Sequence, residues 1–492
     1  MPTEYELFIG GKFVSQGSQE RFPAVNPYNR QEWASIPQAS DDQVADAISA
    51  ARSTFETTWS RTSGVERARL MLKLADLLAA DADRMGRLES TDNGKIIRET
   101  RSQMLFAARQ YRFFAGYADK LWGKVIPLDA RDVLDYAARE PVGVAVLITA
   151  WNSPMGLLSN KMAPALAAGN CVVVKPSEHA SATTLEFARF VEQAGFPPGV
   201  GNVVTGDARV GKALLDSGRI DRISFTGSPA VGREIAANAG RRLVPATLEL
   251  GGKSPNIIFE DADLKKAVVG ALAGIFAATG QTCIAGSRLL VQRPVYQQVV
   301  DQLVERAGKI RLGDPTDTAT EMGTAANEPQ FKRILGSIDN AKAEGAQLAT
   351  GGKAATGDNL DKGFFIEPTI FVDVRNDMTI AQEEVFGPVL SILPFDTEEE
   401  AIEIGNNTKY GLAAGIWTTS IDRAMRVSRG IRAGTVWVNT YRAVAVQAPF
   451  GGFKDSGFGR ERGEIALEEF TNTKNVMIDF SDEERDPFAI KA

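Results

Sequence analysis

From Val142 onward, apolar runs typical of strands alternate with helical segments, and this alternation constrains the fold more than any other feature. "VGVAVLIT" is continuously apolar, "PMGLLSNKMAPALAAG" follows with helical spacing, and "CVVVK" is apolar again. Apolar runs recur every ~20 to 30 residues as far as "ATLELGG", which is typical of βαβ units in a parallel, doubly wound sheet. A second alternating series covers 252–450. We therefore expect an α/β protein with two doubly wound domains.

The flanking segments complete this expected organisation. "ELFIGGKFV" indicates a small hairpin, and helical patterning then extends to Tyr117. "PLDARDVLDYAARE" alternates in polarity and interrupts the first series, and a tail follows Phe470. The predicted units are a Rossmann-like, NAD-binding domain (1–121 and 142–251), a catalytic domain (252–450), and a small β extension for oligomerisation (122–141 and 470–492).

The length, net charge and cysteine count of the chain exclude several classes of protein. At 492 residues the chain needs about three domains or subdomains at ~150 residues each. Its net charge of -7 argues against a nucleic-acid partner, and two cysteines cannot build a disulfide framework. "MPTEYELFIGGKFV" lacks the apolar core of a signal peptide, and no apolar run reaches the ~20 residues of a membrane helix. We expect a soluble, cytoplasmic enzyme without a membrane or nucleic-acid partner.

The two cysteines differ in context. Cys171 begins the apolar run "CVVVK", which predicts a buried structural residue, whereas Cys283 lies in "GQTCIAG" between glycines that permit tight turns. The loop context alone leaves a structural and a reactive role for Cys283 open. The single histidine, His179, is far away in the first series. A histidine-activated hydrolase is therefore disfavoured.

Glu249 is a better candidate for a base. In "TLELGGKSPN" it ends an apolar strand and precedes two glycines. A helix cap or a salt bridge would also explain a glutamate there. However, strand ends of open α/β sheets face the crevice where ligands bind, and a carboxylate in a partly dry site can act as a general base on water.

Seven ordered segments resemble the signatures of the NAD(P)-dependent aldehyde dehydrogenase superfamily. They are "WNSP", "KPSE", "FTGS", "LELGGKSP", "GQTCIAGSRLLV", "EEVFGPV" and "PFGGFKDSGFGRERG", and the resemblance covers nearly the whole chain. It implies the hydrolytic, non-acylating branch, in which Cys283 attacks the aldehyde, Asn152 stabilises the oxyanion, and Glu249 activates water to hydrolyse the thioester. Asn152 could instead cap the helix that starts at Pro154.

The expected cofactor site lacks the usual glycine fingerprint after its first strand. Glycines occur later, in "FTGSPAVGRE", at the start of a helix whose amino terminus favours a phosphate. Lys175 and Glu178 follow the second strand, where an acidic side chain suits ribose hydroxyls and disfavours a 2′-phosphate, so NAD is expected over NADP. A solvated charge pair is the alternative for these two. With the residues that the resemblance adds, the cofactor set is Ile148, Trp151, Lys175, Glu178, Gly227, Ser228, Gly232, Leu250, Glu384 and Phe386, and no metal is expected.

The expected substrate pocket departs from the family pattern. Ser153, Asn160 and Val444 stand where other members often have aromatic residues, while Phe450 keeps one aromatic wall and Ile284 follows the cysteine. The pocket mouth should therefore be wider and more polar, which suits a functionalised or ring-bearing aldehyde.

Two further functions and an assembly state follow from the same segments. An acylating dehydrogenase, which passes the acyl group to coenzyme A, would lack Glu249, and a catalytically silent binding protein on this scaffold would lack Cys283 or Glu249. Both residues are present. The predicted β extension resembles the oligomerisation strands of the family, so a homodimer or homotetramer is expected.

Overall fold

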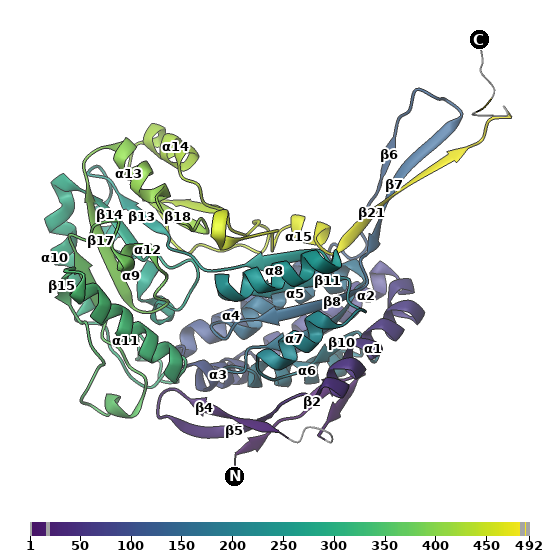
Figure 1. Ribbon diagram of the computed structural model, residues 1–492, viewed down its shortest axis with the longest axis horizontal. Coiled ribbons are helices and arrows are strands. Elements are labelled where there is room, and N and C mark those ends of the chain that lie inside the picture. The colour runs from purple at the N-terminus through teal and green to yellow at the C-terminus, as the bar shows by residue number, and fades with distance from the viewer. Residues whose placement is uncertain (1, 16–19, 483–487, 489–492) are drawn as a thin grey trace.

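The computed structural model describes residues 2–15, 20–482 and 488, and it confirms the predicted fold class. Two α/β bodies lie side by side, and a narrow β extension projects from the first (Figure 1). The predicted domain boundaries remain predictions, and residues 1, 16–19, 483–487 and 489–492 of the predicted segments lie outside the described residues.

The first body is built on an eight-stranded sheet. Its five central strands pair in parallel, the amino-terminal hairpin adds two antiparallel strands at one edge, and a short late strand closes the other edge. The chain therefore returns to the first sheet after building the second. In spatial order the strands are β20 (Gly457–Phe458), β12 (Ala246–Glu249), β11 (Arg222–Thr226), β8 (Val144–Thr149), β9 (Cys171–Pro176), β10 (Gly201–Val203), β2 (Leu7–Ile9) and β3 (Lys12–Val14).

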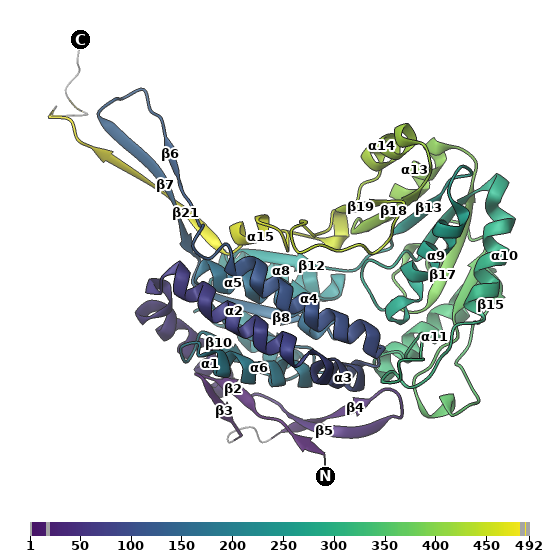
Figure 2. The same cartoon turned by 180° about the vertical axis from the view of Figure 1, so that it is seen from behind.

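Helices cover both faces of this sheet. The helix predicted after the first strand begins with Pro154 at its first turn and ends at Gly169, which adopts the left-handed conformation that favours glycine. This helix, α5, packs with α2, α4 and α6 on one face of the sheet, while α1, α7 and α8 occupy the other face (Figures 1 and 2). The helices are α1 (Asp41–Thr57), α2 (Gly64–Ala80), α3 (Ala82–Asn93), α4 (Ile97–Ala115), α5 (Pro154–Ala168), α6 (Ala182–Ala194), α7 (Ala208–Asp216), α8 (Pro229–Arg242) and α15 (Ile465–Glu468).

The second body repeats the doubly wound plan around a seven-stranded sheet that is parallel except for one edge strand. Its strands, in spatial order, are β15 (Gln347–Thr350), β16 (Thr369–Val372), β17 (Val389–Phe395), β14 (Arg288–Gln292), β13 (Pro255–Ile258), β18 (Ala413–Trp417) and β19 (Thr435–Val438). Its α-helices are α9 (Leu264–Ile275), α10 (Tyr296–Ala307), α11 (Glu328–Ala343), α12 (Thr379–Gln382), α13 (Glu398–Asn406) and α14 (Ile421–Gly430). The short 3₁₀ turns of the chain are η1 (Trp59–Arg61), η2 (Ala277–Gly280), η3 (Arg293–Val295), η4 (Leu360–Lys362) and η5 (Lys454–Ser456).

Two small sheets complete the fold. One, at the amino-terminal end, consists of β1 (Thr3–Glu4), β5 (Gln31–Pro37) and β4 (Arg21–Asn26). The other is the β extension, in which β6 (Lys124–Ile126), β7 (Val133–Pro141) and β21 (Thr471–Asp479) project away from the rest of the molecule (Figures 1 and 2). Among the described residues, no helix is both long and apolar enough to cross a bilayer.

Candidate active site

Cys283 lies on a sharply turned segment between η2 and β14. Ala278 and Thr279 have positive φ angles of 53° and 55°, and a side chain on Gly280 would lie 2.0 Å from the carbonyl oxygen of Gly387. The turn therefore depends on that glycine. Cys283 is partly buried, whereas Cys171 is fully buried, as its apolar context predicts.

The strand end that carries Glu249 lies directly against this turn. A Cβ on Gly252 would lie 2.3 Å from the carbonyl oxygen of Cys283, so a glycine is required where the two segments meet. Gly252 thus serves the close approach of the cysteine loop, whereas a Cβ on Gly251 would lie 2.3 Å from Glu384 Oε2. This contact brings the sequence-predicted nucleophile and base into one region.

Glu249 is a buried carboxylate without a hydrogen-bond partner on either oxygen among the described residues. Burial raises its pKa well above the usual value, and the nearby charge of Glu461 raises it further, while Lys161 acts in the opposite direction. In a dry site, the ionised form of a carboxyl group that has a raised pKa and no hydrogen-bond partner can accept a proton from water.

Asn152 is tied to the cysteine loop rather than to its own helix. Its side-chain nitrogen donates to the carbonyl oxygen of Gln281 at 3.0 Å. The N-cap position of α5 is Ser153, whose side chain makes no capping hydrogen bond. The alternative role of Asn152 as an N-cap is therefore wrong. Lys95 holds the segment that carries Asn152, because its ammonium donates to Ser153 Oγ at 2.7 Å and to the carbonyl oxygen of Asn152.

The environment of Cys283 opposes ionisation of its thiol. Burial raises its pKa to about 12, and the negative charges of Glu384 and Glu249 add to this effect. The charge of Arg462 acts in the opposite direction. The thiol is therefore neutral in this state at physiological pH.

A cavity of about 640 Å³ opens at the carboxyl ends of β8, β9 and β11, and we call it the strand-end cavity. Such ends are where open α/β sheets bind ligands. The hydroxyl groups of Thr149 and Thr226 line it and, within the described chain, have no hydrogen-bond partner. Six of the predicted cofactor residues lie together in its wall: Ile148, Trp151, Lys175, Glu178, Gly227 and Ser228.

Two other predicted cofactor residues pack against each other instead. A Cβ on Gly232 would lie 2.6 Å from the Leu250 side chain, so this glycine lets α8 approach the end of β12. Neither residue lines the strand-end cavity. Ser228 caps α8 by accepting from the Val231 amide at 3.3 Å, and Lys175 lies 3.7 Å from Glu178.

Glu384 and Phe386 approach from the second body. Glu384 Oε1 accepts from the Gly252 amide at 2.9 Å, and burial raises the pKa of this carboxyl group to about 7. The Phe386 ring meets Trp151 edge-on with their centres 5.2 Å apart. These contacts join the rim of the strand-end cavity to the segment that follows Glu249.

The predicted substrate residues come from several separate segments of the chain. Asn160 is buried, and its Oδ1 accepts from Gln110 at 2.7 Å and from Arg462 Nε at 3.2 Å. The carbonyl oxygen of Ile284 accepts from the Tyr441 hydroxyl group at 3.0 Å. Phe450 is buried against Arg462, and Val444 is 49% exposed.

Sequence reasoning missed three groups in this region: Lys95, Arg462 and the fully buried ion pair between Lys161 and Glu461. The adjacent charges in "GRERG" could have drawn attention to Glu461 and Arg462. Glu461 reaches Lys161 on α5, 300 residues earlier, which no local pattern indicates.

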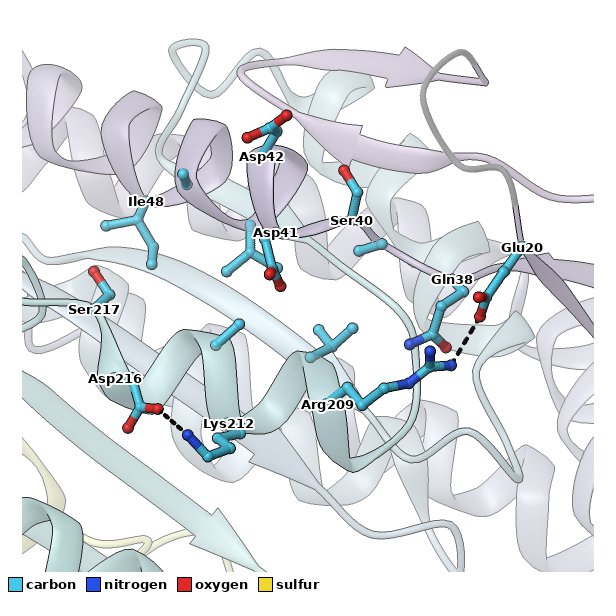
Figure 3. A pocket seen from close by; sticks show the side chains of 15 residues that line it. Glu20, Gln38, Ser40, Asp41, Asp42, Ile48, Arg209, Lys212, Asp216 and Ser217 are labelled. Carbon is cyan, nitrogen blue, oxygen red and sulfur yellow. Dashed lines mark hydrogen bonds and ion pairs between the residues drawn. The ribbon is translucent and has the colours of Figure 1, made fainter.

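Two further cavities lie outside this set. One of about 680 Å³ is lined by Gln103, Phe276, Ala277 and Arg442, beside the segment that leads to Cys283. Another, of about 1000 Å³, lies between α1 and α7 (Figure 3). Its wall includes the ion pairs Glu20–Arg209 and Lys212–Asp216 but none of the predicted site residues.

Comparison with known proteins decides the family. The model of the family described as "Aldehyde dehydrogenase family" matches residues 13–476. The chain belongs to the aldehyde dehydrogenase family. It is an oxidoreductase that acts on aldehydes, as the ordered motifs predict.

Curated relatives of this aldehyde dehydrogenase match along almost their full length. The (Z)-2-((N-methylformamido)methylene)-5-hydroxybutyrolactone dehydrogenase of Acinetobacter baylyi is 44% identical, with 99% of this chain and 100% of the relative covered. The betaine aldehyde dehydrogenase of Bacillus subtilis is 43% identical, with 96% of each chain covered.

Solved structures with NAD⁺ bound have the same fold. Betaine aldehyde dehydrogenase from Staphylococcus aureus superposes with a TM-score of 0.97 at 38% identity and covers 99% of this chain and 97% of its own. Aldehyde dehydrogenase from Bacillus cereus superposes with a TM-score of 0.95 at 43% identity and covers 97% of both chains.

NAD is the cofactor of this aldehyde dehydrogenase, as predicted. The strand-end cavity fits such a group, because its wall holds the two unpartnered threonine hydroxyls and the amino terminus of α8.

Proposed function

We propose that this aldehyde dehydrogenase oxidises a functionalised or ring-bearing aldehyde to a carboxylic acid, with Cys283 as the nucleophile and Glu249 as the general base. The observation that supports this best is the buried carboxylate of Glu249, which has no hydrogen-bond partner and lies on the segment that contacts the Cys283 loop. A buried carboxylate without a partner is costly to a fold, which favours a functional reason for its presence.

In the first half of the reaction, Cys283 Sγ loses its proton and forms a bond with the aldehyde carbon, and the carbonyl electrons move to the oxygen. Two donors serve this oxyanion: the backbone N–H of Cys283 and the side-chain amide of Asn152, which has a second N–H besides the one held by Gln281. Bound NAD accepts the hydride from that carbon, and a thioester on Cys283 remains.

In the second half, Glu249 takes a proton from a water molecule that attacks the thioester. The carbon–sulfur bond breaks, the carboxylic acid leaves, and Cys283 is restored. One aldehyde, one water and one NAD⁺ thus give one acid, one NADH and one proton. Since burial raises the pKa of Glu249, the base form and this step gain with rising pH.

The cofactor is expected to lie along the strand-end cavity. Thr149, Thr226 and the amino terminus of α8 offer polar groups for its phosphates and riboses, and Glu178 faces the ribose hydroxyls and disfavours a 2′-phosphate. Glu384 and Phe386 are expected at the nicotinamide end.

The polar wall of the pocket supports the expected substrate class. Asn160 and Ser153 place amide and hydroxyl groups where many members have aromatic rings, and Val444 leaves the rim open. The relatives from Acinetobacter baylyi and Bacillus subtilis act, by name, on a hydroxybutyrolactone and on betaine aldehyde, and neither is a plain aliphatic aldehyde.

We also infer a homodimer or homotetramer built through the β extension. This three-stranded sheet projects from the body (Figure 1). Its strands also expose several apolar side chains, and monomeric proteins rarely expose large apolar patches. The most exposed of them are Val125, Met477 and Ile478.

The test is a panel of aldehydes followed by the absorbance of reduced nicotinamide. The wild-type enzyme should reduce NAD with at least one polar aldehyde and without coenzyme A. Cys283→Ser should lose turnover while it still binds NAD, because a serine hydroxyl does not ionise as a thiol does. Cys171→Ala, in the core of the first sheet, is the control and should retain turnover. Substantial oxidation by Cys283→Ser would remove Cys283 from the nucleophile role.

A further inference from the structure

Arg462 lies beside the Phe450 ring as a result of a short antiparallel bridge. Phe450 and Glu461 exchange backbone hydrogen bonds of 2.7 and 2.8 Å, so the residue after Glu461 is placed next to the Phe450 ring. Gly451 is the neighbour on the other strand, and a Cβ there would lie 2.9 Å from Glu249 Oε1. The bridge thus connects Arg462 with both the aromatic wall and the base.

The guanidinium group is held in a defined orientation. Its centre lies 4.7 Å from the Phe450 ring and 5.4 Å from the Phe106 ring, and Nε donates to Asn160 Oδ1 at 3.2 Å. Rings and a fixed acceptor orient a planar cation without neutralising it. The backbone of Arg462 adopts a positive φ of 60°, a strained conformation that the fold maintains at this position.

The charge of Arg462 has no partner in the described chain. No carboxylate lies within ion-pair distance, and Nη1 and Nη2 make no hydrogen bond there. The adjacent Glu461 is engaged by Lys161 instead. A guanidinium group carries several N–H donors in a planar arrangement that matches the two oxygens of a carboxylate. Nη1 and Nη2 are therefore suited to an anionic ligand.

We propose that Arg462 binds a carboxylate at the far end of the aldehyde substrate, so that the enzyme prefers aldehydes that are also acids. The inference rests on the proposed function, since the pocket is that of Cys283. Asn160 orients the guanidinium and Phe450 covers it. The cavity of about 680 Å³ beside Phe276 and Ala277 does not oppose an anion, because its lining includes four basic and two acidic side chains.

The test compares three aldehydes of similar size: 4-oxobutanoate, which is anionic, butanal, which is neutral, and betaine aldehyde, which is cationic. For the wild type we expect the highest kcat/KM with 4-oxobutanoate and the lowest with betaine aldehyde. In Arg462→Met the ratio of kcat/KM for 4-oxobutanoate over butanal should fall by about 10- to 100-fold, the size expected for losing a hydrogen bond to a charged group. Arg462→Lys should retain part of the ratio.

Arg109→Met is the matched control, since Arg109 is exposed on α4, the helix that carries Phe106. It should change the ratio by less than about twofold. An equal loss on all three aldehydes in Arg462→Met would overturn the proposal, because it would mean that Arg462 acts only on the charge of Cys283. A loss with neutral 4-hydroxybutanal as large as with 4-oxobutanoate would overturn the assignment of a carboxylate.

A binding measurement separates this inference from the proposed reaction. Butanedioate, but not the neutral butanamide, should slow the alkylation of Cys283 in the NAD-bound wild type and should lose this effect in Arg462→Met. This protection needs no turnover, so it would survive if the proposed reaction failed. Turnover of butanal without any protection by butanedioate would overturn the inference and leave the proposed reaction standing.

Discussion

The side-chain nitrogen of Asn152 donates to the carbonyl oxygen of Gln281 at 3.0 Å, two residues before Cys283. This bond joins the first body to the loop of the nucleophile. It holds the amide beside the place where charge develops on the substrate oxygen, so the donor is oriented before the reaction begins.

Asn152→Ala should therefore lower kcat by about 10²- to 10³-fold, the usual cost of removing one oxyanion donor. Steady-state rates with a good aldehyde measure this. The rate of Cys283 alkylation by iodoacetamide serves as the control and should change little if the loop keeps its place. A fall in kcat of less than about threefold would assign Asn152 to loop support alone.

Glu178→Ala should weaken NAD binding and raise the ratio of kcat/KM for NADP over NAD by about tenfold or more, because a 2′-phosphate no longer meets a carboxylate. Glu234→Ala is a suitable control, since Glu234 lines the same cavity from the exposed side of α8. An unchanged ratio would identify Glu178 as a surface charge paired with Lys175.

The raised pKa of Cys283 predicts how its reactivity depends on pH. In the cofactor-free enzyme, alkylation should accelerate about tenfold per pH unit, without a plateau below pH 10, since only the thiolate reacts. The charge of Glu249 is one of the causes, so Glu249→Gln should lower the pKa and speed alkylation at a given pH. A plateau of the alkylation rate near neutral pH would contradict the raised pKa of Cys283.

Val125→Asp in the β extension should reduce the assembly to smaller species, because it places a charge on the exposed apolar face proposed as the subunit contact. Light scattering after size-exclusion chromatography measures the mass. Val65→Asp, at another exposed valine on α2, should leave the mass unchanged. The same mass for wild type and Val125→Asp would place the subunit contact elsewhere.

The elements of the fold follow closely from local patterns. The strand at Val144–Thr149 and the helix that starts at Pro154 appear where continuous apolar character and the proline at the first turn predict them. The hairpin at Gly10 and Gly11 is likewise present. Such features depend on residues that are neighbours in the sequence, so one sequence is enough to predict them.

Contacts between distant segments could not be predicted in the same way. Asn152 has a residue type that favours N-caps and lies just before α5, yet its side-chain amide donates to Gln281, 129 residues later. Gly232 follows Gly227 in the segment expected to bind the cofactor, yet it lies within α8 and permits the close approach of Leu250. Arg462 meets Phe106 and Asn160 only because the chain returns to the first sheet after the second is complete.

The central claim is that Cys283 forms a thioester which Glu249 resolves, and Glu249→Gln tests it most directly. The amide keeps the size of the side chain but cannot take a proton from water, and removal of a general base typically costs ~10² to 10⁴ in the step it serves. Rapid-mixing measurements should show about one equivalent of NADH per site, followed by slow turnover, and the mass of the quenched enzyme should include an acyl adduct on Cys283. Normal steady-state turnover without an adduct would contradict the account.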